Sequence, residues 1–397
     1  MFVPRAPTFF EYDTRRIAEN VSFLRAHVPG ATLLYSLKCN PFPELVRFMK
    51  SQGLGADAVS AGEVALARSC GFAKEEIFYS APGKNAEDIA AAMDSCVLVA
   101  DSFSELDKIN AIAAQKMITF PVGIRINPAI TMKPASDGEI EYRGTSSKFG
   151  IDEEIVYAET GKLNAYSNII VTGIHIYIRS QINNEDSLVR IAEYCYNVFY
   201  KLKNLLSGRI AFVNIGGGFG IPISPEMRRL SLEKFRNCLV RFAARLQDVE
   251  LYVESGRFLV SEAGTYYTRI EDIKVSRGIT YYITAGTLNG FFRPSLSRIF
   301  SDISGVGAEL PPREPLFSSE ACHRISIVTP NGSISREFCK ANVVGNLCTA
   351  VDCIAENIVL PKASVGDYIS ISNAGAYGRA LTPVGFSSHA APQEYLS

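Results

Sequence analysis

The sequence lacks an excess of charge, a long apolar run and any regular spacing of cysteine. Its 40 lysines and arginines nearly balance 41 aspartates and glutamates, so charge offers no argument for a nucleic acid or an acidic membrane as partner. No apolar run approaches the length of a membrane span, and residues 1–5 do not begin a signal peptide. The nine cysteines are scattered without CxxC spacing, which indicates neither a disulfide framework nor a zinc site. We expect a cytoplasmic protein without a metal.

Strand-like apolar runs alternate with helical patterns between about residues 14 and 255. The eight runs end near Lys38, Ser60, Ala81, Asp101, Asn127, Tyr177, Gly216 and Glu254. Helix signals lie between them, as where Pro43 opens an amphipathic pattern that Gly53 closes. Eight β-α units in roughly 240 residues favour a (β/α)8 barrel over an open sheet.

The pattern changes after Arg257, where strand-like runs follow one another with little helical periodicity. The clearest of these runs are 265–275, 280–285, 325–329 and 368–373. We therefore predict an α/β chain with a barrel domain at 14–258 and a β-sandwich or β-barrel domain at 259–397. A strand at 8–12 is expected to join the second domain, which would then include residues 1–13.

Lys38 closes the first predicted strand of the barrel. A buried ammonium tends to lose its proton, and the neutral amine is the form that condenses with carbonyls. The alternative is a lysine whose apolar stem lies along the strand end while its charge reaches solvent. The choice depends on what stands at the other strand ends, where barrel enzymes place their reacting groups.

Two further strand ends carry groups that suit one cofactor. A glycine triplet at 216–218 follows the seventh strand; it lets backbone N–H groups approach a phosphate, although it also suits a plain tight turn. After the eighth strand, Glu254 could hold a cationic ring nitrogen and Arg257 could bind a phosphate, unless the two form a surface pair. Together with Lys38, these groups describe a site for pyridoxal 5′-phosphate.

With these motifs the chain resembles the fold-type III pyridoxal-phosphate decarboxylases. This family includes the ornithine, arginine and diaminopimelate decarboxylases, with alanine racemase as a more distant relative. The segments that carry the resemblance are 35–40, 55–57, 60–63, 80–84, 125–128, 147–150, 216–218, 254–257, 348–352 and 374–378. The likeness extends over nearly the whole chain. It implies an alanine racemase-like fold and a homodimer whose two active sites lie at the subunit interface.

The resemblance implies a role for each matching residue. Lys38 would hold the cofactor as a Schiff base, Asp57 would lie near the ring or the lysine, and Glu254 would hold the ring nitrogen. The residues that would bind the phosphate are Ser180, Gly216, Gly217, Gly218, Arg257 and Tyr377. Cys348 matches the cysteine that reaches in from the partner subunit and returns a proton to Cα after carbon dioxide leaves. Without the resemblance, a structural cysteine is the simpler interpretation.

Glu254 also favours decarboxylation over racemisation. A carboxylate at the ring nitrogen keeps that nitrogen protonated, so the ring readily accepts the electrons of the breaking bond between Cα and the carboxylate. Alanine racemase has an arginine at this place, which weakens the electron sink. We therefore predict a decarboxylase.

Residues near the predicted cofactor depart from the family pattern. Tyr177 stands where the family has a histidine that stacks on the cofactor; a tyrosine can stack as well but carries no imidazolium charge. The neighbouring His175 is then interpreted as a core histidine. Arg179 replaces a glycine, and it either faces solvent or brings a positive charge to the cofactor phosphate or to the mouth of the substrate site.

The residues after Cys348 bear on the substrate. Basic amino-acid decarboxylases have an acidic residue immediately after this cysteine, where it binds the distal ammonium of the substrate, and here that position is Thr349. An ammonium without its carboxylate is strongly disfavoured, so free ornithine, lysine and diaminopimelate are poor candidates. Residues 388–395 also lack the arginine found near the C-terminus of diaminopimelate decarboxylases. We predict Arg179, Thr349 and Asp352 as substrate-facing residues.

Within the family, the likeness is closest to decarboxylases of specialised metabolism. These act on glutamate tethered to a carrier protein or on a siderophore intermediate. The shared segments are 173–181, 254–257, 347–349, 373–378 and 387–389. We therefore predict a pyridoxal-phosphate-dependent decarboxylase of an amino acid that is conjugated or bound to a carrier protein, in secondary-metabolite or siderophore biosynthesis.

Three alternatives stay open. The chain could be a diaminopimelate or basic amino-acid decarboxylase, an amino-acid racemase, or a catalytically inactive homologue that binds partners. A protein that only binds partners would not need five residues with catalytic or cofactor-binding roles, which argues against the last alternative. The five residues are Lys38, Glu254, Arg257, Cys348 and Tyr377.

Overall fold

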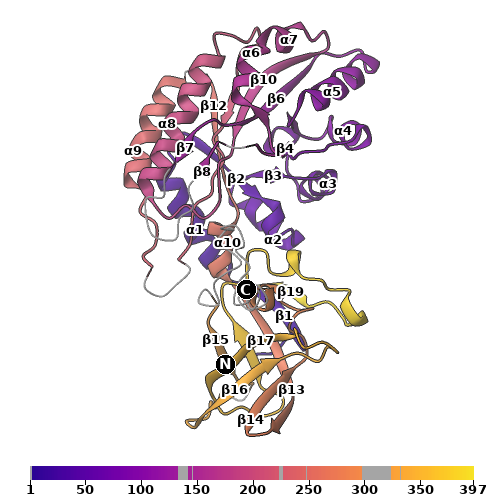
Figure 1. Cartoon of the computed structure of the whole chain (residues 1–397), viewed down its shortest axis with the longest axis vertical. Helices are drawn as coiled ribbons and strands as arrows, with labels where there is room; N and C mark the ends of the chain where they lie inside the picture. Colours follow the sequence, from indigo (N-terminus) through magenta and orange to yellow (C-terminus); the bar gives the residue numbers. More distant parts are fainter. Residues whose placement is uncertain are drawn as a thin grey trace. The chain divides into compact units, whose positions relative to one another are not determined.

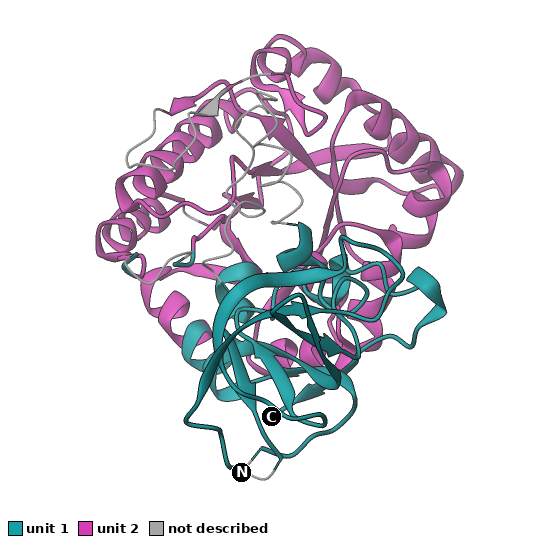
Figure 2. Cartoon of the chain, turned by 60° about the horizontal axis from the view of Figure 1, so that its bottom comes forward, with its two compact units in different colours: residues 1–20, 221–228, 257–397 teal, residues 21–220, 229–256 magenta. Residues whose placement is uncertain are grey.

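The chain divides into two compact units, which Figure 2 shows in different colours. The computed structural model describes residues 2–132, 142–144, 146–222, 227–246, 248–296, 323–330 and 332–397. The barrel unit comprises Val21–Gly220 and Arg229–Gly256, and the β unit comprises Met1–Asn20, Ile221–Arg228 and Arg257–Ser397. The contiguous domains at 14–258 and 259–397 stay a proposal. Residues 14–20 and 221–228 lie within the predicted barrel domain but belong to the β unit.

Eight parallel strands of the barrel unit form a closed ring (Figure 1). In order around the ring they are β2 (Ala31–Ser36), β3 (Gly55–Ala58), β4 (Ile77–Ser80), β5 (Val97–Ala100), β6 (Phe120–Asn127), β10 (Ile169–Ile176), β11 (Phe212–Asn214) and β12 (Glu250–Ser255). Pairing of β12 with β2 closes the ring, and β9 (Ile151–Asp152) adds to β6. Each predicted strand end lies within two residues of the observed one. The predicted (β/α)8 barrel is therefore confirmed.

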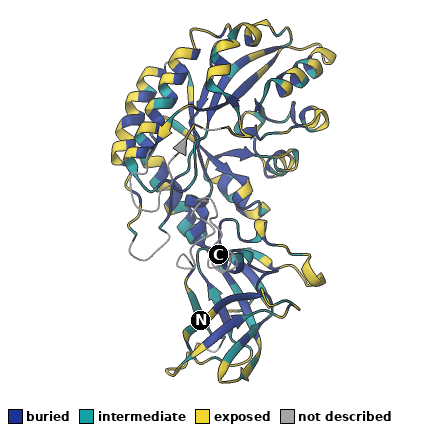
Figure 3. Ribbon diagram, in the orientation of Figure 1, coloured by how far each residue is buried: buried dark blue, intermediate teal, exposed yellow. Residues whose placement is uncertain are grey.

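The connecting helices have one apolar side, which explains why they pack on the ring. They are α1 (Thr14–His27), α2 (Pro43–Ser51), α3 (Ala61–Ser69), α4 (Ala86–Ala92), α5 (Phe103–Gln115), α6 (Glu153–Ala158), α7 (Thr160–Ala165), α8 (Glu185–Leu202) and α9 (Glu233–Leu246). In α8, Leu188, Ile191 and Cys195 recur at helical spacing and are buried. Figure 3 shows the ring strands mostly buried and the helices exposed on one side. No helix in the described parts of the chain is both long and apolar enough to cross a membrane.

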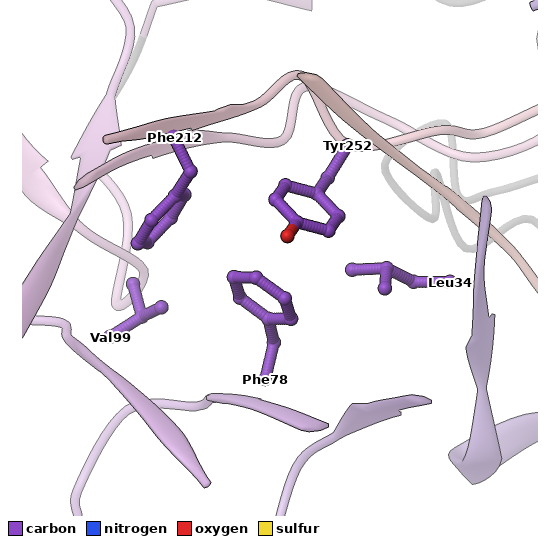
Figure 4. Packing of buried hydrophobic residues seen from close by; sticks show 5 residues of the cluster. All are labelled: Leu34, Phe78, Val99, Phe212 and Tyr252. Carbon is purple, nitrogen blue, oxygen red and sulfur yellow. The ribbon is translucent and has the colours of Figure 1, made fainter. Parts of the chain in front are cut away.

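Large apolar side chains from five strands meet inside the ring and form its floor (Figure 4). They are Leu34, Phe78, Val99, Phe212 and Tyr252. The other three strands contribute glycines at the corresponding positions, and these make room for the large residues. A Cβ on Gly173 would lie 2.0 Å from the ring of Phe212, one on Gly123 would lie 2.8 Å from that ring, and one on Gly55 would lie 2.5 Å from Leu34.

A polar layer lies next to this floor, on the side of the strand C-termini. Side chains of a strand face the same side at every second residue. Two residues after each floor position stands a polar residue: Ser36, Asp57, Ser80, Asp101, Arg125, His175, Asn214 and Glu254. All eight are buried. The barrel therefore presents polar groups at the end where enzymes of this architecture carry out their chemistry.

The β unit is built on one eight-stranded sheet. Six strands lie in the order β15 (Ile325–Val328), β18 (Tyr368–Ile371), β13 (Gly264–Ser276), β14 (Ile279–Thr284), β16 (Phe338–Val344) and β17 (Cys353–Pro361). The strand predicted at 8–12 is β1 (Thr8–Tyr12), which pairs with β13 and with β19 (Gln393–Leu396). Alternating burial along β13 places Tyr266, Thr268 and Ile270 in the core of this unit.

Candidate functional site

A chain of polar contacts crosses the polar layer of the barrel. Ser80 Oγ lies 2.8 Å from Nδ1 of His175, and Nε2 of His175 lies 3.1 Å from Oε1 of Glu254. Asn214 donates a hydrogen bond of 2.8 Å from Nδ2 to the same Oε1, and its Oδ1 accepts a hydrogen bond of 2.8 Å from the backbone N–H of Gly216. Strands β4, β10, β11 and β12 thus hold one network that ends at the glycine triplet.

Glu254 is buried, and its charged neighbours favour the ionised carboxylate. Burial alone raises the pKa of this carboxyl, but His175, Lys38 and Arg125 lower it to about 2. A buried carboxylate that keeps its charge can hold a protonated ring nitrogen.

Lys38 lies outside the strand that it was expected to close. β2 ends at Ser36, and Lys38 stands in a 3₁₀ turn, Leu37–Cys39, whose two other residues are buried. The Lys38 side chain is 41% exposed, as in the alternative of a lysine whose charge reaches solvent. Its Nζ lies 3.6 Å from Oδ2 of Asp57, which is 2% exposed. The site therefore combines a reachable amine with a buried carboxylate.

Asp57 has an oxygen with unused hydrogen-bonding capacity. Burial and the charge of Glu254 raise its pKa, and Lys38 offsets this rise only in part. Among the described residues, no hydrogen bond reaches Oδ2 of Asp57. An acceptor of this kind, beside an accessible amine, is suited to a polar ligand.

Tyr177 connects the amine to the segment that carries Ser180. Its ring centroid lies 5.9 Å from Nζ of Lys38 and 5.9 Å from Cζ of Arg125. Its hydroxyl lies 2.6 Å from Oγ of Ser180. The tyrosine hydroxyl therefore holds the hydroxyl of Ser180 in place. Arg179, between them in sequence, is partly buried.

The glycine triplet lies against neighbouring backbone so closely that no side chain would fit. A Cβ on Gly217 would lie 1.8 Å from the carbonyl oxygen of Glu254, and one on Gly218 would lie 2.1 Å from that of Arg179. The φ angles of Gly216 and Gly218 are +67° and +88°, which favours glycine. Ile182 donates a backbone hydrogen bond of 2.8 Å to Gly218. The triplet and the segment of Ser180 therefore lie side by side.

The remaining predicted residues belong to the β unit. Arg257 begins α10 (Arg257–Val260) and is buried, and its guanidinium carbon lies 4.8 Å from the ring centroid of Tyr377. Cys348 lies in the loop between β16 and β17 and is the exposed cysteine among those described. Thr349, next to it, is partly buried.

Asp352 is held inside the β unit by its own chain. It is 3% exposed, and its carboxylate accepts hydrogen bonds from the hydroxyl of Thr287 and from the backbone N–H groups of Leu288 and Leu347, at 3.0 and 2.8 Å for the last two. These bonds fix the loop that bears Cys348. The contacts of Asp352 thus favour an anchoring role over the predicted contact with substrate.

Several residues of the network were not expected to take part in the site. The sequence pattern predicts only a core histidine at His175, and it assigns no role to Ser80, Asn214 or Arg125. One signal in the sequence could have found all four: each stands two residues after a floor position of its strand. Among the described residues, no cluster of three or more His, Cys, Asp or Glu side chains could hold a metal ion.

Comparison with known proteins places the chain in a family. The family model for the pyridoxal-binding domain of pyridoxal-dependent decarboxylases matches residues 14–261. An L-glutamyl-[BtrI acyl-carrier protein] decarboxylase from Niallia circulans is 30% identical over 98% of this chain and 88% of its own length. The diaminopimelate decarboxylase of Aquifex aeolicus is 27% identical over 94% of this chain and 82% of its own.

A solved structure shows the same fold. The diaminopimelate decarboxylase of Helicobacter pylori, complexed with L-lysine, superposes with a TM-score of 0.81 at 24% identity, covering 99% of this chain and 92% of that one. The family match spans the whole barrel, and the carrier-protein decarboxylase aligns along nearly the full chain. This protein therefore belongs to the pyridoxal-dependent decarboxylases and is an amino-acid decarboxylase that uses pyridoxal 5′-phosphate.

Proposed function

We propose that the enzyme decarboxylates an amino acid whose far end is conjugated or bound to a carrier protein. The loop of Cys348 carries this proposal. Asp352 is the one acidic residue at 345–352, and its carboxylate already accepts three hydrogen bonds from the chain. The position after the cysteine is Thr349, which has no charge. This loop therefore offers no free carboxylate to the distal ammonium of a basic amino acid.

The comparisons support the same substrate class, but they also offer a second candidate substrate. The relative from Niallia circulans is named for a glutamyl group on an acyl-carrier protein, and it is 30% identical. Diaminopimelate decarboxylases such as that of Aquifex aeolicus are somewhat less similar, at 27% identity. Free diaminopimelate is thus the second candidate substrate.

The barrel residues fit the three parts of the cofactor. When bound, pyridoxal 5′-phosphate supplies an aldehyde that condenses with amines and a protonated ring that accepts the electrons of the breaking bond. Lys38 presents the amine that would hold the aldehyde carbon, and Asp57 lies beside it. Glu254, which keeps its charge, would retain the proton on the ring nitrogen. The ring of Tyr177 would support the cofactor face.

The phosphate would be held by the cradle of Gly216, Gly217 and Gly218. This loop lies too close to neighbouring backbone for side chains, and its glycines would let backbone N–H groups face an anion. Ser180, whose hydroxyl is fixed by Tyr177, would donate to the same phosphate.

The β unit would complete the site in a homodimer. We propose that Arg257 and Tyr377 bind phosphate, since they already lie in contact with each other. Cys348 of the partner would return a proton to Cα after carbon dioxide leaves, which requires an accessible thiol, and this one is exposed. Thr349 and Arg179 would face the far end of the substrate.

Release of carbon dioxide from matched substrates tests the proposal. The wild-type enzyme is expected to act on glutamate joined to a carrier protein at least about 10²-fold more efficiently than on free diaminopimelate, ornithine or lysine, because their distal ammonium stays unpaired. Detection of carbon dioxide from each substrate, at equal concentrations, measures this ratio. Efficient turnover of free diaminopimelate would instead establish the second candidate.

Replacing Thr349 with aspartate should change the substrate preference. The new carboxylate would meet a distal ammonium, so kcat/KM for a free basic amino acid is expected to rise by roughly 10- to 100-fold, while that for a carrier-bound substrate falls. Thr349→Asn, which has nearly the same size without the charge, is the control and should leave the preference unchanged. An equal response of both variants would remove Thr349 from the substrate site.

A further inference from the structure

We propose that His175 is a positioning residue: with Ser80 behind it, it fixes one oxygen of the Glu254 carboxylate and leaves the other for the ring nitrogen of the cofactor. This inference deepens the proposed function and rests on the role of Glu254 there. It gives a specific task to a histidine that the sequence pattern assigns to the core.

The three residues stand on rigid elements. Ser80 ends β4, His175 lies near the end of β10, and Glu254 lies near the end of β12; their side chains are almost fully buried. Both nitrogens of the imidazole face a polar partner, Ser80 at 2.8 Å and Glu254 at 3.1 Å. Groups held on strands keep their geometry better than groups on loops.

The contacts of the Glu254 carboxylate with His175 and Asn214 involve one of its two oxygens. His175 and Asn214 both approach Oε1, at 3.1 and 2.8 Å. The other oxygen, Oε2, is therefore the one assigned to the ring nitrogen of the cofactor. Nε2 of His175 lies 3.1 Å from Oε1 but does not have the alignment of a hydrogen bond. Catalytic contacts are often of this kind before a ligand binds, and they shorten afterwards.

Charge explains why this position needs a histidine. The titratable groups that act on Glu254 are Lys38 from the turn after β2, Asp57 from β3, Arg125 from β6 and His175 from β10. Burial raises the pKa of Glu254, and among the groups that lower it again His175 has the largest effect. Without the imidazole, the carboxyl would protonate more easily and would no longer retain a proton on the ring nitrogen.

Ser80 keeps the imidazole in place in either charge state. A hydroxyl donates to Nδ1 when the ring is neutral and accepts from Nδ1–H when the ring is charged. A histidine that only filled the core would not need partners on both nitrogens. The chain offers a matched control: Nε2 of His27, on α1, lies 3.3 Å from Oε1 of Glu233, far in sequence from every strand end of the site.

Nitrogen-15 NMR of the cofactor-free protein tests the contact directly. The ring signals of His175 are expected to shift in Ser80→Ala and in Glu254→Gln, and to stay unchanged in His27→Gln. This result does not depend on activity or on bound cofactor. Unchanged His175 signals in both site variants would overturn the inference.

Kinetics of the loaded enzyme tests the consequence. In His175→Leu, kcat is expected to fall by about 10- to 100-fold, the effect typical of outer partners that orient a reacting group, while KM changes by less than about threefold. The acid limb of the kcat–pH profile should move to higher pH, because Glu254 then protonates at higher pH. His175→Gln should restore part of kcat through its amide N–H, and His27→Leu should change neither kcat nor the acid limb.

The outcomes separate the two proposals. If the wild type binds cofactor and releases carbon dioxide but His175→Leu keeps its kcat and its acid limb, only the inference about His175 fails. If the wild type binds no cofactor, the proposed function fails while the NMR result still decides whether His175 contacts Glu254. Should the leucine variant not fold, Ser80→Ala carries the same test, with a smaller fall in kcat and the same direction of the acid limb.

Discussion

Lys38→Ala is expected to lower kcat/KM by roughly 10⁴-fold or more, the scale on which enzymes lose activity when a group that bonds covalently is removed. The amine of Lys38 is reachable from solvent and stands 3.6 Å from Asp57, and the barrel strands offer no second lysine in this position. The same variant should lose the visible absorption band of the covalently bound cofactor. Carbon dioxide release and the absorption spectrum measure the two effects.

The fold should survive this change. Lys38 is 41% exposed and lies in a turn between two buried residues, so its removal leaves no core cavity. The thermal midpoint of the cofactor-free protein is therefore expected to stay close to that of the wild type. Lys234→Ala, which removes an exposed lysine paired with Asp186 at 2.8 Å, is the control and should retain full activity. Substantial turnover by Lys38→Ala would refute the role assigned to this residue.

Glu105→Ala is expected to destabilise the protein by about 3–5 kcal/mol, the usual effect of removing one partner of a buried ion pair. The Lys84 side chain has no exposed surface, and its Nζ donates 2.7 Å to Oε2 of Glu105 and 2.5 Å to the carbonyl of Ala81. Glu105 also accepts backbone N–H groups from Lys84 and Asp101, at 3.0 and 2.9 Å. Urea unfolding of the cofactor-free protein measures the loss.

Two further variants show whether the unpaired ammonium causes that loss. Burial lowers the pKa of Lys84, and the charge of Glu105 offsets part of this effect. Without Glu105, the buried ammonium of Lys84 loses its ion-pair partner and is unfavourable. The double variant Lys84→Met, Glu105→Gln should recover part of the stability, because it removes both charges while the amide oxygen can still accept a backbone N–H group. Asp94→Asn, which breaks the exposed pair with Lys116, should cost less than about 1 kcal/mol. Equal losses in Glu105→Ala and Asp94→Asn would contradict the burial argument.

The barrel could be predicted because its strands carry local signals. Apolar runs of strand length, closed by glycine-rich or polar turns, mark the ends of β11 and β12 in sequence alone. The exposure of Lys38 could not be predicted this way. Whether the chain continues as a strand after Ser36 or turns at Leu37 depends on contacts with neighbouring strands, and periodicity does not report those contacts.

The contacts within the site depend on residues far apart in sequence. Ser80, His175 and Glu254 meet only because β4, β10 and β12 lie in the same ring, so no local pattern pairs them. Asp352 is the opposite case. Its motif suggests a substrate contact, but the carboxylate bonds to Leu347 of its own loop and to Thr287 and Leu288 before any ligand arrives. The motifs single out Glu254 and Asp352, and the fold shows which contacts each of them makes.

The packing of the apolar floor also affects the position of the polar layer next to it. The eight residues of the polar layer each stand two residues after a floor position of the same strand. A methyl group added at Gly173 would collide with Phe212 and shift the strand that carries His175. Mutations in the floor would thus alter the alignment of Glu254 with its partners as well as stability. The packing of the barrel core therefore also determines where the polar groups of the site stand.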